Sequence, residues 1–243
     1  ETKKKKREPQ WDKSNSTWFF PDKFVAPDLK SNHESKGKWR PFQLAFILST
    51  IKSTVLMEDE DHEEVELIFF PTGGGKTEAY LGLSAFTSFY KRLIDPDEAG
   101  VNVIMRYTLR LLTAQQFTRA SSLICAMEKI RENYEEELGE TEFSIGVWVG
   151  NTSTPNKMKG SASFPGAMEL YNKLIRGGRD DSYKFLITKC PWCSAHIGKV
   201  NTREARAPKC IGLKTQGDRV IFKCQARDCD FNKPLPIYVV DDD

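Results

Sequence analysis

The sequence predicts an α/β fold, in which helices cover both faces of a parallel sheet and a small cysteine-containing module lies beside it. Short apolar runs alternate with segments of helical periodicity along residues 39–183, and this alternation is typical of parallel sheets with crossover helices. A glycine-rich turn follows the first apolar run directly. From about residue 184, paired cysteines and short turns replace the alternation, so residues 184–240 are expected to form a separate module.

The expected elements follow one another along the chain. Residues 1–38 are polar, with interspersed aromatic residues and prolines, and we interpret them as an extended arm lying on a larger body. A helix is expected from residue 39 to about 55, and an acidic exposed loop over 57–64. The strands of the sheet are expected at 65–70, 101–105 and 144–149, the helices after them at 76–93, 109–136 and 167–175, and strands of the module at 218–223 and 237–243.

The first expected strand runs into a glycine-rich phosphate-binding segment at residues 71–78. Glycines let successive backbone N–H groups point into one concave site, and the start of the next helix adds its positive end. Lys76 can reach the β- and γ-phosphates of ATP and the Thr77 hydroxyl can bind Mg²⁺, so we assign both to catalysis. The nucleotide-binding set in this loop is Thr72, Gly73, Gly74, Gly75, Lys76, Thr77 and Glu78. Since Phe70 stands where the general pattern has glycine, a glycine-rich turn with a chance Lys-Thr pair is the alternative.

The bulk composition suits one large α/β domain with a small module. The 243 residues carry a net charge of +2, with 39% hydrophobic and 29% charged residues, which is typical of a soluble protein. No apolar run has the length of a membrane span, and no apolar signal segment follows the basic run Lys3–Arg7. We interpret that run as a solvated terminus, with nucleic-acid contact as the alternative. Because the chain begins with Glu1 rather than Met, we expect a piece of a longer protein.

The cysteine pattern predicts a structural zinc site. Six cysteines without a secretory signal favour metal binding over disulfides. Two pairs, each resembling a zinc knuckle, can converge on one tetrahedral site with no open position, as in a zinc ribbon. The predicted ligands are Cys190, Cys193, Cys224 and Cys229. Cys210 or His196 could replace one ligand, Cys125 is expected in a helix core, and unpaired buried cysteines are the alternative to a metal site.

The phosphate loop resembles motif I of the superfamily 2 helicases and translocases, which reads Pro-Thr-Gly-x-Gly-Lys-Thr-Glu. About 30 residues earlier, Arg40 and Gln43 match the Arg-x-x-Gln pattern by which that superfamily reads adenine. A glutamine amide both donates and accepts hydrogen bonds, which suits the adenine edge. The resemblance implies a RecA-like ATP-binding lobe over residues 39–183, with Arg40 and Gln43 at the base of the nucleotide.

Residues 106–116 resemble motif Ia, through which these motors contact nucleic acid. Arg110 and Gln115 match its spacing, whereas Thr108 stands one residue farther from the arginine than usual. Hydroxyl and guanidinium donors at a helix start suit a phosphate of the DNA backbone, although an ordinary helix cap is the alternative. Asn151 and Thr154, in the loop after the third expected strand, are further candidates for DNA contact.

The motif that completes the catalytic site, Asp-Glu-x-His, is missing at its expected place. Residues 59–62 spell it, but they lie in an acidic run before the phosphate loop instead of after an apolar strand. We therefore expect motifs I and Ia here, motif II elsewhere, and no ATP turnover by this chain alone.

Residues 69–81, 105–117, 147–156 and the Cys190–Cys193 knuckle together resemble the helicase subunits of the DISARM anti-phage defence system. The resemblance covers about residues 39–240. It implies an ATP-driven motor on DNA in the bacterial cytoplasm, acting with a partner subunit and a methyltransferase. It also implies that a zinc-bearing insertion separates motif Ia from motif II, and that a second RecA-like lobe with an arginine finger lies beyond residue 243.

Two rival interpretations stay open at this point. One is a restriction-type translocase that tracks duplex DNA without separating its strands. The other is a nucleotide-gated DNA-binding scaffold that is not a motor, with the cysteine module as its recognition element.

Overall fold

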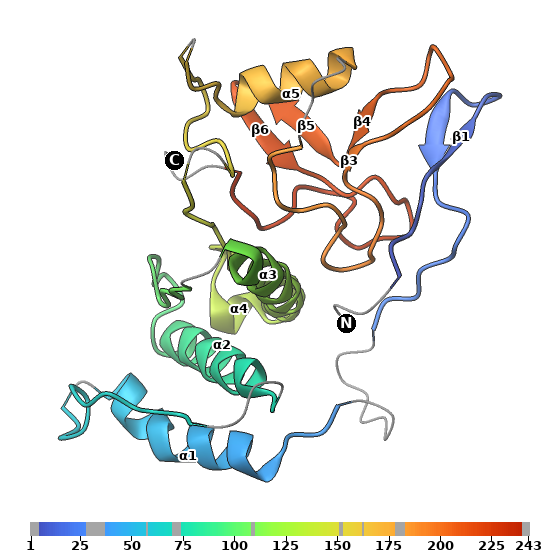
Figure 1. The fold of residues 1–243 in the computed structure, drawn as a ribbon. Helices are drawn as coiled ribbons and strands as arrows, with labels where there is room; N and C mark the ends of the chain where they lie inside the picture. The colour runs from blue at the N-terminus through green and yellow to red at the C-terminus, as the bar shows by residue number, and fades with distance from the viewer. Residues whose placement is uncertain are drawn as a thin grey trace. The chain divides into compact units, whose positions relative to one another are not determined.

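The computed structural model describes residues 5–27, 37–56, 58–69, 74–107, 110–150, 153–161, 163–177 and 183–239. The chain divides into two compact units (Figure 1). The helical unit comprises residues 28–106 and 127–142, and the cysteine unit comprises 1–27, 107–126 and 143–243. Helix α3, Arg110–Asn133, contributes residues to both. We find no helix among the described residues that could span a bilayer.

The helical unit is built on α1, Pro41–Val55, and α2, Lys76–Ile94, which pack against each other (Figure 1). Helix α1 begins with a proline, whose fixed φ suits the first helical position and whose missing N–H is not needed there. The two helices approach closely at Gly82, where an added Cβ would lie 3.2 Å from Ile47 Cδ1 of α1 and 2.5 Å from Cη2 of Trp39, which precedes α1. The short helix α4, Glu135–Leu138, also contacts α2. The helices predicted at 39–55 and 76–93 are thus confirmed.

Arg92, near the end of α2, anchors this helix to the segment after α4. Its side chain is buried, and Nη1 donates hydrogen bonds to the carbonyl oxygens of Leu138 (2.9 Å) and Thr141 (2.8 Å). Burial, and after it the positive charge of Arg131, lowers the pKa of Arg92. An arginine stays charged in proteins, so the two carbonyl groups compensate a buried cation.

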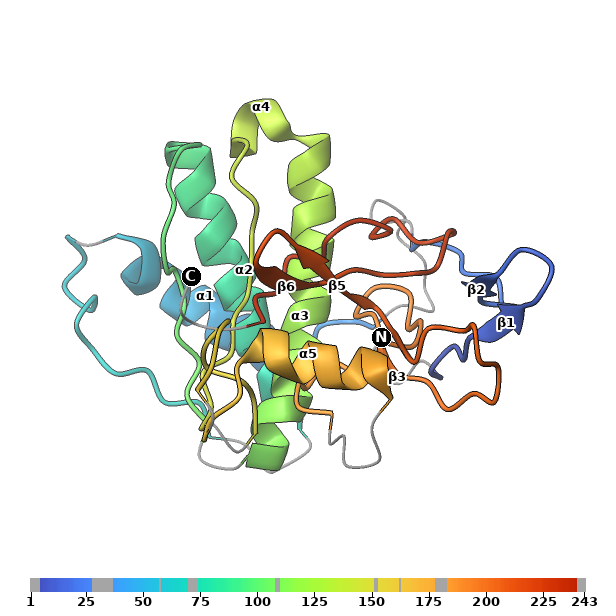
Figure 2. The same cartoon turned by 90° about the horizontal axis from the view of Figure 1, so that it is seen from above.

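The described residues of the cysteine unit form three antiparallel strand pairs and one helix of their own. Strands β1 (Gln10–Asp12) and β2 (Thr17–Phe19) form a hairpin in the arm. Helix α5, Ala167–Arg176, contacts β6 (Figure 2). The remaining pairs are β3 (Gly198–Lys199) with β4 (Cys210–Ile211), and β5 (Leu213–Gln216) with β6 (Arg219–Phe222). The expected helix at 167–175 and strand at 218–223 are confirmed.

The described residues do not form the predicted parallel sheet. Segments 65–69 and 101–105 have no regular structure, and 144–149 has a single parallel bridge, between Ile145 and Ile237. Their apolar side chains are largely exposed: Val65 by 92%, Ile104 by 86% and Trp148 by 83%.

A strand needs neighbouring strands to pair its backbone groups and a packed layer to bury its side chains. Among the described residues, 65–69 and 101–105 have neither, whereas 144–149 has the one bridge and packs Ile145 and Val147 against the core of the cysteine unit. The missing partner strands are the physical reason that the β-prone composition does not produce strands. The strands that do form belong to local antiparallel hairpins and pairs, where the partner is close in sequence.

Replacement of Arg92 by Ala is expected to destabilise the helical unit by about 2 kcal/mol, because two carbonyl groups lose a charged donor. Lys91→Ala, at the neighbouring and less buried position, should change stability by less than about 0.5 kcal/mol. Urea unfolding followed by circular dichroism measures both. Equal stability of the two variants would contradict the anchoring role of Arg92.

Candidate functional site

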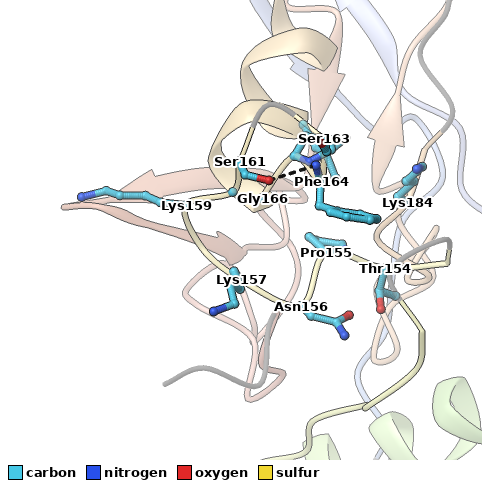
Figure 3. A pocket seen from close by; sticks show the side chains of 13 residues that line it. Thr154, Pro155, Asn156, Lys157, Lys159, Ser161, Ser163, Phe164, Gly166 and Lys184 are labelled. Carbon is cyan, nitrogen blue, oxygen red and sulfur yellow. Dashed lines mark hydrogen bonds between the residues drawn. The ribbon is translucent and has the colours of Figure 1, made fainter.

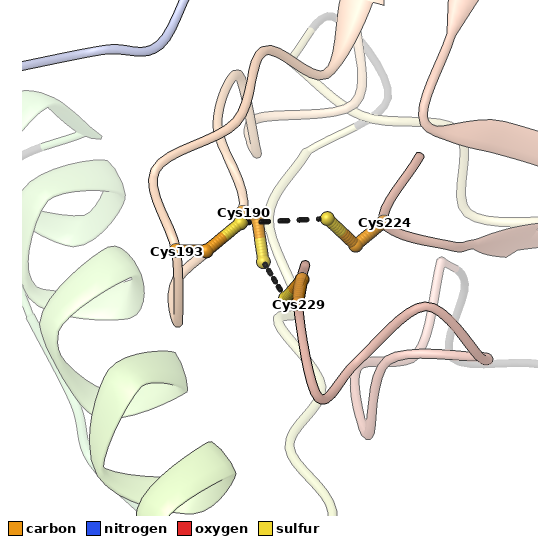
Figure 4. A group of neighbouring side chains, drawn as sticks. All are labelled: Cys190, Cys193, Cys224 and Cys229. Atoms are coloured by element: carbon orange, nitrogen blue, oxygen red, sulfur yellow. Dashed lines mark hydrogen bonds between the residues drawn. The ribbon is translucent and has the colours of Figure 1, made fainter. Parts of the chain in front are cut away.

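Four cysteine side chains converge in the cysteine unit. Their sulfur atoms all lie within 4.8 Å of one another, and all four residues are buried (Figure 4). The Sγ–Sγ distance is 3.9 Å from Cys190 to Cys229 and 3.5 Å from Cys193 to Cys224. The structure thus brings together the four residues predicted as metal ligands, from segments separated by more than thirty positions.

Two tight turns present these thiols. In the first, Cys190 N–H donates to Ala195 O (2.7 Å), Ser194 N–H donates to Cys190 O (2.9 Å), and Ser194 adopts a positive φ. In the second, Cys229 N–H donates to Ala226 O (3.2 Å). Each turn closes on itself through backbone hydrogen bonds, which leaves the thiols free to point at the common centre.

The dimensions of the cluster fit a tetrahedral metal ion. With Zn–S bonds of about 2.3 Å, the edges of a sulfur tetrahedron are about 3.8 Å long, close to the two distances above. Hydrogen bonds from Cys190, and then from Cys224 and Cys229, lower the pKa of the Cys193 thiol, whereas burial is the main cause that raises the pKa of Cys190. Thiolates are the form that binds metal, so a cation such as zinc would replace the thiol protons of the cluster.

The two alternative ligands, and Cys125, lie outside this cluster. Cys210 is in β4, and burial raises its pKa to about 12, so it behaves as a packed thiol. His196 contacts Lys199 O through Nε2 (2.9 Å) and the Glu8 carboxylate through Nδ1 (3.2 Å), so both ring nitrogens already face oxygen atoms. Cys125 is fully buried in the α3 part of the core.

In the helical unit, the predicted adenine-reading pair contacts the phosphate loop. Arg40 Nη1 donates to Gly74 O (2.6 Å), and Gln43 Nε2 donates to Gly75 O (2.7 Å). Gln43 Oε1 accepts a hydrogen bond from the Arg40 backbone N–H (2.8 Å), so both ends of the amide are used. The Gln43 side chain is only 4% exposed.

The hydrogen bond from Gln43 to the carbonyl oxygen of residue 75 requires a glycine at that position. Its φ is +95°, and a Cβ added there would lie 2.8 Å from Gln43 Nε2 and 3.4 Å from Glu78 Oε2. A larger residue would therefore be strained in its backbone and would push the glutamine away. Lys76 and Thr77 follow as the first two residues of α2, both half-buried, while Glu78 is exposed. Thr72 and Gly73 lie outside the described residues.

The predicted DNA contacts are only partly described. Thr108 and Asn151 lie outside the described residues, Arg110 is the first residue of α3, and Gln115 is exposed on that helix. Thr154 is buried, with 4% exposure, and lines a cavity of about 830 Å³ (Figure 3).

Sequence reasoning missed this cavity and its basic lining. Lys157, Lys159 and Lys184 line it together with the exposed ring of Phe164. The Glu169 carboxylate already accepts the N–H groups of Gly160 and Gly166 beside it, so the backbone donors at the start of α5 are occupied. The only sequence signal was the pair of lysines flanking Met158, directly after the loop that the sequence had singled out.

Comparison with known proteins relates this chain to a defence protein. It is 36% identical over 213 residues to DISARM protein DrmA of Bacillus paralicheniformis, a match that covers 85% of this chain and 18% of that protein. The chain is therefore DrmA-like over most of its length, which confirms the predicted resemblance to a DISARM protein. No family model matches the chain. No solved structure matches it either.

Replacement of any one of the four clustered cysteines by serine is expected to reduce bound zinc from one ion per chain to a substoichiometric amount, because three thiolates leave the site open. Cys210→Ser is the matched control, since Cys210 is equally a buried cysteine of this unit but lies outside the cluster. Metal analysis by mass spectrometry after dialysis gives the stoichiometry. Loss of zinc in Cys210→Ser alone would contradict the assignment.

Proposed function

We propose that this DrmA-like chain is the ATP-binding part of a DNA-directed motor that acts in DISARM anti-phage defence. The single observation that carries the nucleotide assignment is the contact of Arg40 and Gln43 with the carbonyl groups of Gly74 and Gly75. A base-reading pair and a phosphate loop more than thirty residues apart in sequence meet in one place, as a nucleotide site requires. The defence role rests on the similarity to DISARM protein DrmA. The matched relative is much longer than this chain, which spans 18% of it.

The proposed roles follow from charge and position. The backbone N–H groups at the start of α2 and the Lys76 ammonium stabilise the phosphates, while the Thr77 hydroxyl holds the Mg²⁺ that neutralises their charge. Arg40 and Gln43 contact the adenine and, through Gly74 and Gly75, fix the loop that carries the phosphates. Base recognition is thereby connected to phosphate binding by two hydrogen bonds. Phosphoryl transfer depends mainly on such positioning, so the water-orienting carboxylate and the arginine finger are still needed for turnover.

We further propose that segments 65–69 and 101–105 belong to the parallel sheet of a RecA-like lobe. Their exposed apolar side chains are consistent with strands that pack when neighbouring strands are present. Thr108, Arg110, Gln115 and Asn151 are proposed to face the DNA backbone, whereas the predicted contact Thr154 is buried and is not proposed to do so. A partner subunit of the defence complex is expected in the bacterial cytoplasm. The clustered cysteines hold a structural zinc ion that stabilises the module between motifs Ia and II.

In the full-length protein, Lys76→Ala is expected to lower DNA-stimulated ATPase activity at least about 100-fold, because it removes the cation nearest the transferred phosphoryl group. Lys91→Ala, near the opposite end of the same helix, is the control and should retain wild-type turnover. A colorimetric phosphate assay measures both. Near wild-type activity of Lys76→Ala would overturn the phosphate-loop assignment. Strand-displacement and triplex-displacement assays on the same preparation then separate a helicase from a duplex-tracking translocase.

Gln43→Glu is expected to weaken ATP binding about tenfold and to reduce the preference for ATP over GTP. The glutamate keeps an oxygen that can accept from the Arg40 N–H but cannot donate to Gly75 O or to the base. Fluorescent-nucleotide titration with ATP and GTP as competitors measures the preference. An unchanged preference in Gln43→Glu would show that this residue does not contact the base.

A further inference from the structure

The arm reaches the metal-binding turn through Arg7. The Arg7 N–H donates to Ser194 O (2.8 Å), the His196 N–H donates to Arg7 O (3.0 Å), and Arg7 forms a parallel bridge with Ala195. These residues directly follow the ligand Cys193. The arm therefore pairs, through its backbone, with the turn that carries the ligands Cys190 and Cys193.

The Arg7 side chain is held on the cluster by neighbours on several sides. It is 7% exposed, and its Nη2 donates to Asp22 O and to Asp228 Oδ2, the latter at 2.7 Å. The rings of Phe20 and Phe24 lie 5.4 and 5.9 Å from its guanidinium carbon. Asp228 immediately precedes the ligand Cys229 and also accepts the Phe24 N–H (2.7 Å), so the same carboxylate fixes the arginine and the arm.

Two guanidinium nitrogens are not explained by these contacts. Nε and Nη1 are buried and have no hydrogen-bonded acceptor in the described part of the chain. Unsatisfied buried donors of a charged group are costly and call for an explanation. The ligand Cys193 immediately precedes Ser194, whose carbonyl oxygen accepts the Arg7 N–H, and the charge of the Cys193 thiol is among the causes that raise the pKa of Arg7.

A cysteine cluster that holds a metal ion needs N–H donors close to its sulfur atoms. Four thiolates around a divalent ion leave a net charge of about −2 in a buried site, which is unfavourable unless N–H groups and a cation compensate it. Partners in the shell around the ligands typically contribute 10–100-fold to metal affinity. Arg7 is a buried cation with two unused N–H groups beside one of the ligands.

We propose that Arg7 is a positioning residue of the metal centre, donating from Nε or Nη1 to the metal-bound Cys193 sulfur, so that the arm is part of the zinc site. Because binding free energies are coupled reciprocally, metal loading then favours the docked arm, and a docked arm strengthens metal binding. This inference rests on the metal site and is independent of the motor activity.

Arg7→Ala and Arg7→Lys test the proposal against the control Arg206→Ala, an exposed arginine of the same unit. Zinc affinity is measured by competition with a chromogenic chelator. Arg7→Ala is expected to weaken zinc binding 10–100-fold and Arg206→Ala to leave it unchanged. Arg7→Lys keeps the positive charge but loses the planar set of donors, so an intermediate loss is expected, and this variant keeps the test decisive if Arg7→Ala fails to fold.

Two readouts separate a contact with sulfur from simple anchoring of the arm. In the cobalt-loaded protein, loss of a hydrogen bond to Cys193 should shift the thiolate-to-cobalt charge-transfer band in both Arg7 variants. Hydrogen exchange at the His196 amide should accelerate on metal removal in the wild-type chain, because its acceptor is Arg7 O. Zinc affinity and cobalt spectra that match the wild type in Arg7→Lys and Arg7→Ala would overturn the proposal. If the wild-type chain binds no zinc, the metal site itself is wrong, and the proposal for Arg7 is wrong with it.

Discussion

The convergence of four buried thiols is the constraint on which the cysteine unit depends. Cys193 and Cys224 are 31 positions apart, and Cys190 and Cys229 are 39 apart, yet their sulfur atoms meet within hydrogen-bond distance. Short strand pairs bury too little apolar surface to hold such loops together alone. A bound metal ion would supply the missing free energy, and metal binding and folding would then be one process.

The helical unit depends on a different kind of constraint, a backbone that only glycine can adopt. The positive φ of Gly75 turns the chain into α2 and exposes a carbonyl group to Gln43. The glutamine is buried by this contact, so the residue proposed to read the base also supports the loop proposed to hold the phosphates. The local geometry of the loop therefore agrees with the proposed function.

Sequence reasoning predicted the local features and the convergence of the four cysteines well, and the other long-range contacts poorly. Pro41 and the helical periodicity located α1, and the Gly-Lys-Thr segment located the start of α2, because these signals act within a few residues. Segments such as 101–105 were predicted as strands from composition, but a strand depends on partners that composition does not supply. Arg7 was interpreted as part of a solvated basic run, whereas it is buried against Asp228, more than two hundred positions away.

X-ray absorption spectroscopy at the zinc edge tests the central claim most directly, since it reports the atoms around the metal in the folded chain. The account predicts one zinc ion per chain with four sulfur neighbours at about 2.3 Å. A first shell that contains nitrogen or oxygen at about 2.0 Å, or a purified chain without tightly bound zinc, would contradict it.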